Sequence, residues 1–449
     1  MPESHFRQTP RVTGAGTIDQ CRIVMILPAC RLRDVAFGIR VAMTLTVLCG
    51  AATGPAWAVS VDDFLARMYS GPQGTLPYRL FVPDGYTPAQ EYPLVLFLHG
   101  LGENGNDNRN QLEGQTGPLV FAAPANQAVH PSFMLAPQCP LGSAWTDTSM
   151  RLRVAGIIDG LRNEFSLDTN RYYITGLSLG GYGTWDYLSQ YPDMYAAAIP
   201  MSGGGPGGLA SRLKKLAIWN FHAADDDTVS VDNSRSMVTA VRRAGGSVVY
   251  TEYATGGHVI WTEAYATPVL MDWVYAQRRG AASVTEPLLA LGTPSADPTW
   301  YTGATNVDLA GTASALGQTI KSVSWFNYAN NARGTAVGIG AWSVAKVPLV
   351  ANKTNVVVVT ATTTSWVPAY GGNTTFNGAL AVVQSPLKEK MALQGGQTIL
   401  QWTGGGPPFR VLRSGDPTGL DWTEVANPAT SPLVLDMGVG LGFYRVVGR

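Results

Sequence analysis

Cysteine is scarce in this sequence, with 4 in 449 residues, and three of them (Cys21, Cys30 and Cys49) precede residue 59. The rest of the chain holds Cys139 alone, which excludes an internal disulfide there. An excess of one charge is also missing, because 31 basic residues balance 31 acidic ones. Such a chain is not typical of nucleic-acid-binding proteins, so we expect no such partner. Metal-ligand spacing of His, Cys and Asp is missing too, and we predict a protein that needs no metal or other cofactor.

Long hydrophobic runs are absent as well, since no stretch is apolar over the ~20 residues that a membrane-spanning helix requires. A shorter apolar stretch, VAMTLTVLCGAA, follows Arg31, Arg33 and Arg40 and leads to the sequence AWA at 56–58. A charged region, a short apolar region and a small-x-small site form the pattern of a secretory signal. We therefore predict that residues 1–58 are a leader and that the protein is secreted, extracellular or periplasmic, and not held in a membrane.

From Leu76 to Arg279, short apolar runs alternate with helical patterns, which is typical of βαβ units around a parallel sheet. We assign residues 59–280 to this α/β domain. The expected buried strands cover residues 92–100, 132–138, 172–176, 196–203, 216–222 and 248–253.

The composition changes after Arg279, where Thr, Val, Asn and Gly become frequent in short alternating runs. We predict a linker at 281–300 and a β-sandwich of immunoglobulin type at 301–387. The tail at 388–449 is again strand-like and is expected to form a small third β-module.

One serine stands between glycines where an apolar run meets a helical pattern, in ITGLSLGGYGTWDYL (Ile174–Leu188). Gly176-Leu177-Ser178-Leu179-Gly180 fits G-x-S-x-G, the nucleophile elbow, in which the serine occupies a strained turn between a strand and a helix. A plain glycine-rich turn is the alternative, but the strand-to-helix context favours the elbow. Ser178 is therefore the candidate nucleophile.

A serine hydroxyl needs a base and an orienting acid, which in this arrangement follow it in the order acid, then histidine. His222 and His258 are the histidines that come after Ser178. His222 precedes any candidate acid, so the order excludes it as the base. His258, in ATGGHVIW after the last expected strand, is the candidate base.

The acid is expected in FHAADDDTVSV, where Asp225, Asp226 and Asp227 follow a strand. We favour Asp226, because Val229 three residues later could pack the loop into the core. Asp225 and Asp227 stay as alternatives and are otherwise expected to be solvated loop acids.

Two backbone amides are needed to bind the oxyanion of an acyl-transfer reaction. One should belong to Leu179, the residue after the nucleophile. The other should follow an early strand, and in FLHGLGENG this position is Leu101. His99 is expected to brace that loop.

With these motifs, residues 76–279 resemble the α/β-hydrolase superfamily, and more narrowly the secreted feruloyl and acetylxylan esterases and the polyhydroxyalkanoate-depolymerase-like hydrolases. The resemblance rests on YPLVLFLHGLGENG, YYITGLSLGGYGTWDYLSQYP, FHAADDDTV and TGGHVIWTEAY. It implies a doubly wound, mostly parallel sheet. It also implies a Ser-His-Asp esterase mechanism, with the family pattern H-G-x-x-D-x-x-V falling on His222, Asp226 and Val229.

The interval at 204–215 is too short for a cap domain, so we expect an open site that suits large or polymeric esters. Trp145 could offer a flat wall for a substrate ring or could be a packing residue; both interpretations stay open. Feruloyl or acetyl esters of polysaccharide, polyesters and peptides are the candidate substrates, and a non-catalytic binding protein is the alternative of another class. The C-terminal β-modules could bind a polysaccharide or polymer surface or only act as spacers.

Overall fold

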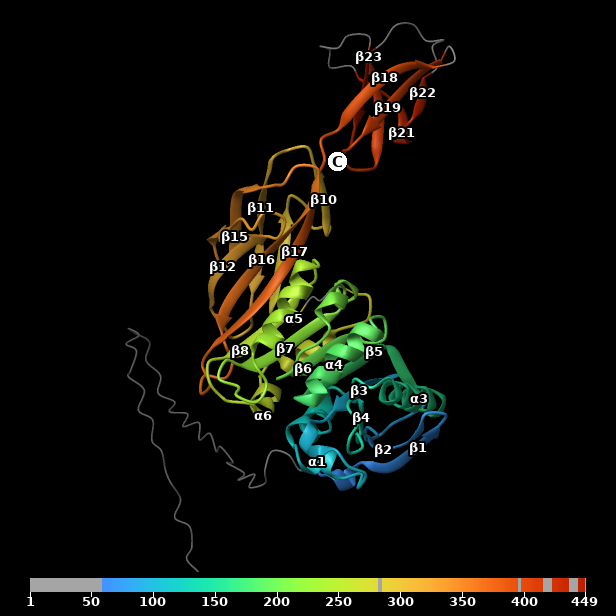
Figure 1. Cartoon of the computed structure of the whole chain (residues 1–449), viewed down its shortest axis with the longest axis vertical. Coiled ribbons are helices and arrows are strands. Elements are labelled where there is room, and N and C mark those ends of the chain that lie inside the picture. Colours follow the sequence, from blue (N-terminus) through green and yellow to red (C-terminus); the bar gives the residue numbers. More distant parts are fainter. Residues whose placement is uncertain (1–58, 282–284, 395–396, 415–421, 436–442, 449) are drawn as a thin grey trace, which may run out of the picture. The chain divides into compact units, whose positions relative to one another are not determined.

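The computed structural model describes residues 59–281, 285–394, 397–414, 422–435 and 443–448, and the predicted leader lies outside them. Its first part is built on eight strands joined by helices (Figure 1). The strands are β1 (Leu65–Gly71), β2 (Gly74–Phe81), β3 (Tyr92–Leu98), β4 (Phe133–Pro137), β5 (Leu167–Leu177), β6 (Ala197–Met201), β7 (Ala217–Ala223) and β8 (Val248–Tyr253). The helices are η1 (Val61–Asp63), η2 (Leu101–Glu103), α1 (Asn110–Glu113), η3 (Gly117–Phe121), α2 (Pro124–Val129), α3 (Thr148–Glu164), α4 (Leu179–Gln190), η4 (Gly207–Leu213), α5 (Asp232–Arg243), α6 (Trp261–Tyr265) and α7 (Leu270–Ala276).

The strands follow one another in the order β1-β2-β4-β3-β5-β6-β7-β8, and all neighbours from β4 to β8 are parallel. β2 pairs antiparallel with both β1 and β4. This order and these directions are those of the α/β-hydrolase fold, so the predicted fold class is confirmed. Each of the six expected strands is present within a few residues of its predicted bounds, while the hairpin β1–β2 has no counterpart among them.

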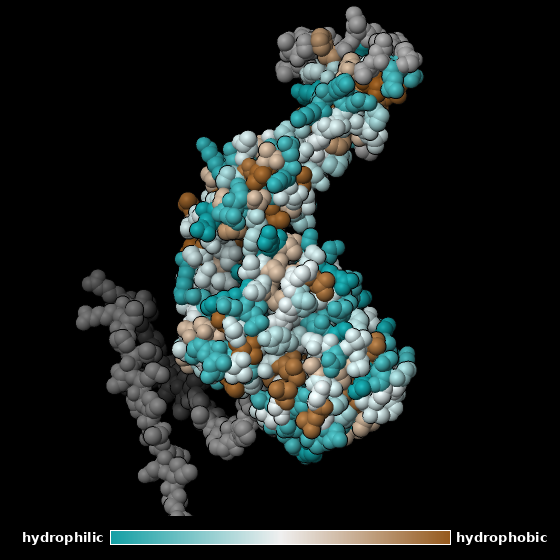
Figure 2. All heavy atoms as spheres, in the orientation of Figure 1, coloured by the Kyte–Doolittle hydropathy of each residue, from teal (hydrophilic) through white to brown (hydrophobic). Residues whose placement is uncertain are grey.

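The sheet is buried on both faces, because helices pack on each side and receive the side chains that alternate along each strand. Val95 and Phe97 of β3 point into one core layer with residues of α6 and α7. Leu94 and Leu96 point into the other layer, with residues of α3, α4 and α5. On the face seen in Figure 2, apolar side chains lie in small groups among hydrophilic ones. The continuous apolar runs that predicted these strands are thus explained by burial on two sides.

A β-sandwich follows, and its strands are β9 (Leu288–Thr293), β10 (Thr299–Thr302), β11 (Asn306–Ser314), β12 (Ile320–Asn327), β13 (Arg333–Thr335), β14 (Val337–Gly338), β15 (Ala341–Pro348), β16 (Lys353–Thr364) and β17 (Asn373–Gln384). One layer is the sheet β14-β15-β11-β9, and the other contains β17, β16, β12 and β13. Val344 and Val347 pack with Val357 and Leu380 in the core between the layers. The sandwich is confirmed, and its immunoglobulin type stays a prediction. The range 281–300 expected as a linker instead contains β9, which pairs with β11 and buries Leu289.

The two parts share a sheet, which the sequence did not predict. β17 pairs antiparallel with β8 through Asn373–Glu252, Thr374–Thr251 and Thr375–Tyr250. The sheet of the α/β domain therefore continues into one layer of the sandwich as a 13-stranded sheet within the described residues.

The small C-terminal module has strands β18 (Lys388–Gln394), β19 (Gln397–Thr403), β20 (Phe409–Ser414), β21 (Thr423–Ala429), β22 (Leu433–Leu435) and β23 (Phe443–Val447). They form two three-stranded sheets around a core that includes Leu400, Trp402 and Val411.

Candidate active site

Ser178 stands at the turn between β5 and α4, as the elbow motif predicts. Its backbone has φ 53° and ψ −116°, a region that residues other than glycine rarely adopt. Backbone strain of this kind costs about 1–3 kcal/mol and persists where the surrounding structure imposes it. The Ser178 amide donates to the Met201 carbonyl at 3.0 Å, and the Ser178 carbonyl accepts from Tyr182 at 3.1 Å. The hydroxyl is thereby held at the carboxyl edge of the sheet, where loops build sites.

The glycines around Ser178 are required by close backbone approach. A Cβ on Gly180 would lie 1.8 Å from the Leu98 carbonyl oxygen, and one on Gly176 would lie 2.3 Å from the Gly180 oxygen. A Cβ on Gly181 would lie 2.2 Å from the Met201 oxygen. Helix α4 can therefore begin directly behind the serine only if these positions lack side chains.

Two hydrogen bonds join three side chains that are far apart in sequence. His258 Nε2 lies 2.8 Å from Ser178 Oγ, and His258 Nδ1 lies 2.8 Å from Asp226 Oδ2. Because a carboxylate can only accept, Nδ1 carries the proton and Nε2 is free to accept from the serine hydroxyl. The Asp226 side chain is fully buried and that of His258 is partly exposed. The arrangement can remove the proton of Ser178 as its oxygen attacks an acyl carbon.

Asp226 is kept ionised by its surroundings. Burial alone would raise its pKa, but hydrogen bonds from the Val229 amide, His258 and the Thr228 amide bring the pKa below its usual value. Oδ1 accepts from these two amides at 2.8 Å and 3.0 Å. Val229 thus orients the acid through its N–H group, whereas its half-buried side chain is not part of the core into which we had expected it to pack.

His222, which the chain order excluded as the base, has a different place in the site. Its Nε2 lies 3.1 Å from Asp226 Oδ2 and 2.9 Å from the Val229 carbonyl oxygen, so Nε2–H donates. Nδ1 lies 2.7 Å from Ser234 Oγ, which also lies 3.0 Å from the Gly203 carbonyl oxygen. Burial lowers the pKa of His222, which favours this neutral form. Sequence reasoning missed this contact, although the H-x-x-x-D spacing on His222 and Asp226 carried the signal.

Asp225 and Asp227 are exposed, but Asp225 is more than a solvated acid. Its carboxylate accepts from the amides of Gly257 at 2.8 Å and Gly256 at 3.3 Å. Asp227 accepts from the neighbouring Thr228 hydroxyl at 3.2 Å. Asp225 thus binds the loop that carries His258, a role we had not expected.

The expected oxyanion donors, Leu101 and Leu179, are the first residues of η2 and α4. The first N–H groups of a helix have no partner within that helix. Both helices follow strands, β3 and β5, that pair in parallel in this sheet. That these two amides bind an oxyanion stays a prediction.

The expectation that Trp145 could face a substrate is not met. Its side chain is fully buried, and its Nε1 donates to the His99 carbonyl at 2.9 Å. His99 in turn accepts from the Cys139 amide through Nε2 at 2.9 Å. Trp145 is therefore a packing residue, because its side chain lies between the His99 ring, which it meets edge-on at 4.9 Å, and Gly183 of α4. Burial raises the pKa of Cys139 to about 12, so this thiol is no nucleophile.

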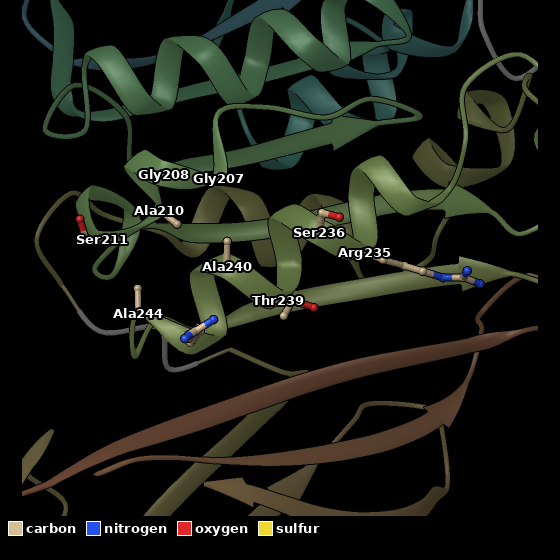
Figure 3. A pocket seen from close by; sticks show the side chains of 10 residues that line it. Gly207, Gly208, Ala210, Ser211, Arg235, Ser236, Thr239, Ala240 and Ala244 are labelled. Atoms are coloured by element: carbon tan, nitrogen blue, oxygen red, sulfur yellow. The ribbon is translucent and has the colours of Figure 1, made fainter. Parts of the chain in front are cut away.

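The connection between β6 and β7 contains only the short helix η4, as expected for a site without a cap domain. A surface hollow lies between η4 and α5, lined by residues such as Ser211, Ser236 and Thr239 (Figure 3). None of Ser178, Asp226 and His258 lines it. We assign no role to this hollow.

Metal-binding clusters and membrane-spanning helices are absent from the described residues. No group of three or more His, Cys, Asp or Glu side chains there is placed to hold a metal ion. Among the same residues, no helix has both the length and the hydropathy for a membrane span.

Comparison with known proteins places this chain beside esterases. It is 27% identical over 156 residues to a bifunctional acetylxylan esterase/xylanase of Neocallimastix patriciarum, covering 34% of this chain and 22% of that protein. It is 29% identical over 154 residues to poly(3-hydroxyalkanoate) depolymerase C of Paucimonas lemoignei, covering 33% of this chain and 37% of that protein. The chain thus spans well under half the length of these relatives. No protein-family model matches the sequence.

A solved structure described as a thermostable esterase shares 44% identity, with a TM-score of 0.48, over 49% of this chain and 64% of the other. The esterase and depolymerase relatives agree with the resemblance that the motifs indicated, which is confirmed.

Proposed function

We propose that this protein is a secreted serine carboxylesterase. The observation that carries the proposal is the chain of hydrogen bonds from Ser178 through His258 to Asp226, at 2.8 Å and 2.8 Å, with the serine on a strained elbow. A hydroxyl with both a base and a buried carboxylate behind it is the arrangement that acyl transfer requires. Export is supported by the signal pattern of the leader sequence.

In the proposed mechanism, Ser178 Oγ attacks the ester carbonyl carbon while His258 Nε2 takes its proton. Asp226 stabilises the imidazolium, and the amides of Leu101 and Leu179 bind the oxyanion. The imidazolium then protonates the leaving alcohol, and the C–O bond breaks to give an acyl-enzyme. Water, deprotonated by His258, attacks the acyl carbon and releases the carboxylic acid.

The proposed substrate is a large or polymeric ester, such as a feruloyl or acetyl ester of polysaccharide. The open site without a cap and the acetylxylan esterase relative support this class. The depolymerase relative supports a polyester as the second candidate. Peptides are less suited, because amide cleavage demands stronger protonation of the leaving group.

The test uses p-nitrophenyl esters and a fluorophosphonate probe on the wild-type protein and two serine variants. We expect Ser178→Ala to lower turnover by up to ~10⁶-fold and to abolish labelling. Ser236→Ala, at an exposed serine on α5 away from the site, should change neither. Normal hydrolysis by Ser178→Ala would contradict the mechanism, and an unlabelled, inactive wild type would favour a binding protein.

A second assay separates the substrates. Feruloylated arabinoxylan, acetylated xylan, polyester film and a chromogenic peptide are compared for released product. Release from the film alone would replace the polysaccharide assignment by the polyester one.

A further inference from the structure

The loop that carries His258, residues 254–260, is held by a residue of the β-sandwich. Tyr370 lies in the connection between β16 and β17. Its carbonyl oxygen accepts hydrogen bonds from the amides of Ala254 at 3.1 Å and Thr255 at 3.2 Å. It also lies 3.4 Å from the Thr255 hydroxyl, which donates to it. These bonds fix the direction in which the chain leaves β8 toward the imidazole.

The Tyr370 ring covers the next part of the same loop. A Cβ added to Gly256 would come within 3.1 Å of two carbons of this ring, so the ring lies directly against the glycine. The ring of Tyr253 meets it edge-on with centroids 5.4 Å apart. Burial and the Glu263 carboxylate of α6 raise the pKa of the Tyr370 hydroxyl. Tyr370 therefore contacts the loop from Ala254 to Gly256, directly before the histidine.

The connection that holds Tyr370 is itself constrained. Ser365 Oγ donates to the Gly371 carbonyl at 2.5 Å, which closes the turn. Gly372 has φ 84°, and a Cβ there would lie 2.1 Å from the Glu252 carbonyl oxygen. The ring of Trp366 meets Trp219 of β7 edge-on at 5.6 Å. The turn is thus seated on the catalytic domain.

A half-buried arginine joins the two domains by hydrogen bonds behind this turn. Arg242 of α5 donates to Asn377 Oδ1 and to Thr375 Oγ1, both at 3.0 Å. Asn377 also accepts from the Val248 amide and donates to the Gly246 carbonyl, both at 3.0 Å. Burial lowers the pKa of Arg242 to about 10. Separating the domains would leave these polar groups without partners.

We propose that Tyr370 is a positioning residue for His258, and that the sandwich therefore completes the hydrolase site in addition to any spacing or surface-binding role. The inference rests on the proposed esterase function. Its physical basis is that proton transfer needs the imidazole within hydrogen-bond reach of the serine, and a displacement of about 1 Å can cost ~10²-fold in rate. The other hydrogen bonds that hold this loop run from the Gly256 and Gly257 amides to Asp225 and from Ser202 Oγ to the His258 carbonyl at 3.2 Å.

The test compares Tyr370→Ala, Tyr370→Phe and a control, Trp325→Ala, at a half-buried aromatic residue on β12 of the same sandwich. We expect Tyr370→Ala to lower kcat by about 10- to 100-fold, with KM changed by less than about threefold. Tyr370→Phe keeps the ring on Gly256 and should stay within about threefold of the wild-type kcat. Trp325→Ala should lower the Tm without lowering kcat. Tyr370→Leu serves if Tyr370→Ala does not fold.

Hydrogen exchange gives a readout that does not depend on activity. The amides of residues 254–260 should exchange faster in Tyr370→Ala than in wild type, and at the wild-type rate in Trp325→Ala. Unchanged kcat and exchange in Tyr370→Ala would overturn the inference, as would equal losses of kcat in Tyr370→Ala and Trp325→Ala. A wild-type protein that hydrolyses no ester would instead contradict the proposed function. The hydrogen-exchange rates of residues 254–260 would still decide whether Tyr370 holds the loop.

Discussion

His222 Nε2 lies 3.1 Å from Asp226 Oδ2, the same carboxylate oxygen that accepts from His258. One carboxylate thus serves two imidazoles, one buried and one at the edge of the site. The buried imidazole keeps the acid oriented while the other is free to exchange protons with the serine.

We predict that His222→Leu lowers kcat because Asp226 loses a donor. A hydrogen bond to a charged group contributes about 1.5–3 kcal/mol. Loss of the share of this free energy that stabilises the transition state should reduce kcat by about 10-fold. His130→Ala is the matched control, since His130 binds Asp272 at 3.0 Å and stacks on Tyr275. Steady-state kinetics on a p-nitrophenyl ester measure both. A His222→Leu enzyme as fast as His130→Ala would contradict this role.

The three consecutive aspartates should separate cleanly by function. Asp226→Ala should cost about 10⁴-fold in kcat, as loss of a triad acid does. Asp225→Ala should cost about 3- to 10-fold, because the amides of Gly256 and Gly257 lose a charged acceptor. Asp227→Ala should have no effect, and it is the control for both. If Asp227→Ala lowered kcat as much as Asp225→Ala, the effect would come from the charge of the loop and not from the two hydrogen bonds to the Gly256 and Gly257 amides.

Two helical glycines should respond in opposite ways to alanine. Gly180→Ala places a Cβ 1.8 Å from the Leu98 carbonyl, and forcing helix and sheet apart should cost about 1–3 kcal/mol of unfolding free energy or more. A Cβ added to Gly160 in α3 would meet no atom within 4 Å, so Gly160→Ala should gain about 0.5–1 kcal/mol. Denaturant unfolding measures both. A Gly180→Ala protein of wild-type stability would refute the account of the elbow.

Acid should destabilise the protein partly through His99. Burial lowers the pKa of His99 to about 4 from its ordinary 6.5. Between these pH values His99 binds a proton in the unfolded chain but not in the folded one. The unfolding free energy therefore falls as the pH drops from 6.5 toward 4. Denaturant unfolding of His99→Gln across this range should show a shallower decline, while above pH 7 the two curves should run parallel. An equally steep decline in the variant would assign the effect to other groups.

Local sequence patterns predicted most of the catalytic domain because its strands are buried on both faces and read as continuous apolar runs. The same patterns could not predict that β9 lies in the range expected as a linker, since a half-buried edge strand with pattern LLALGT carries little signal. Nor could they predict that β17 pairs with β8, because pairing between distant strands depends on which edge is left open. Trp145 shows the same limit, since its residue type fits a substrate wall and a core equally well.

The sequence by itself determined the elbow, the order of serine, acid and histidine, and the strand-to-helix alternation, because these depend on glycine sterics and on local periodicity. Only the tertiary structure decided that Asp226 serves two histidines, that Asp225 binds the histidine loop and that Tyr370 of the sandwich lies against it. The reason is physical: these contacts join residues separated by 31 or more positions, or depend on which oxygen of a carboxylate faces which donor, and no local pattern encodes either.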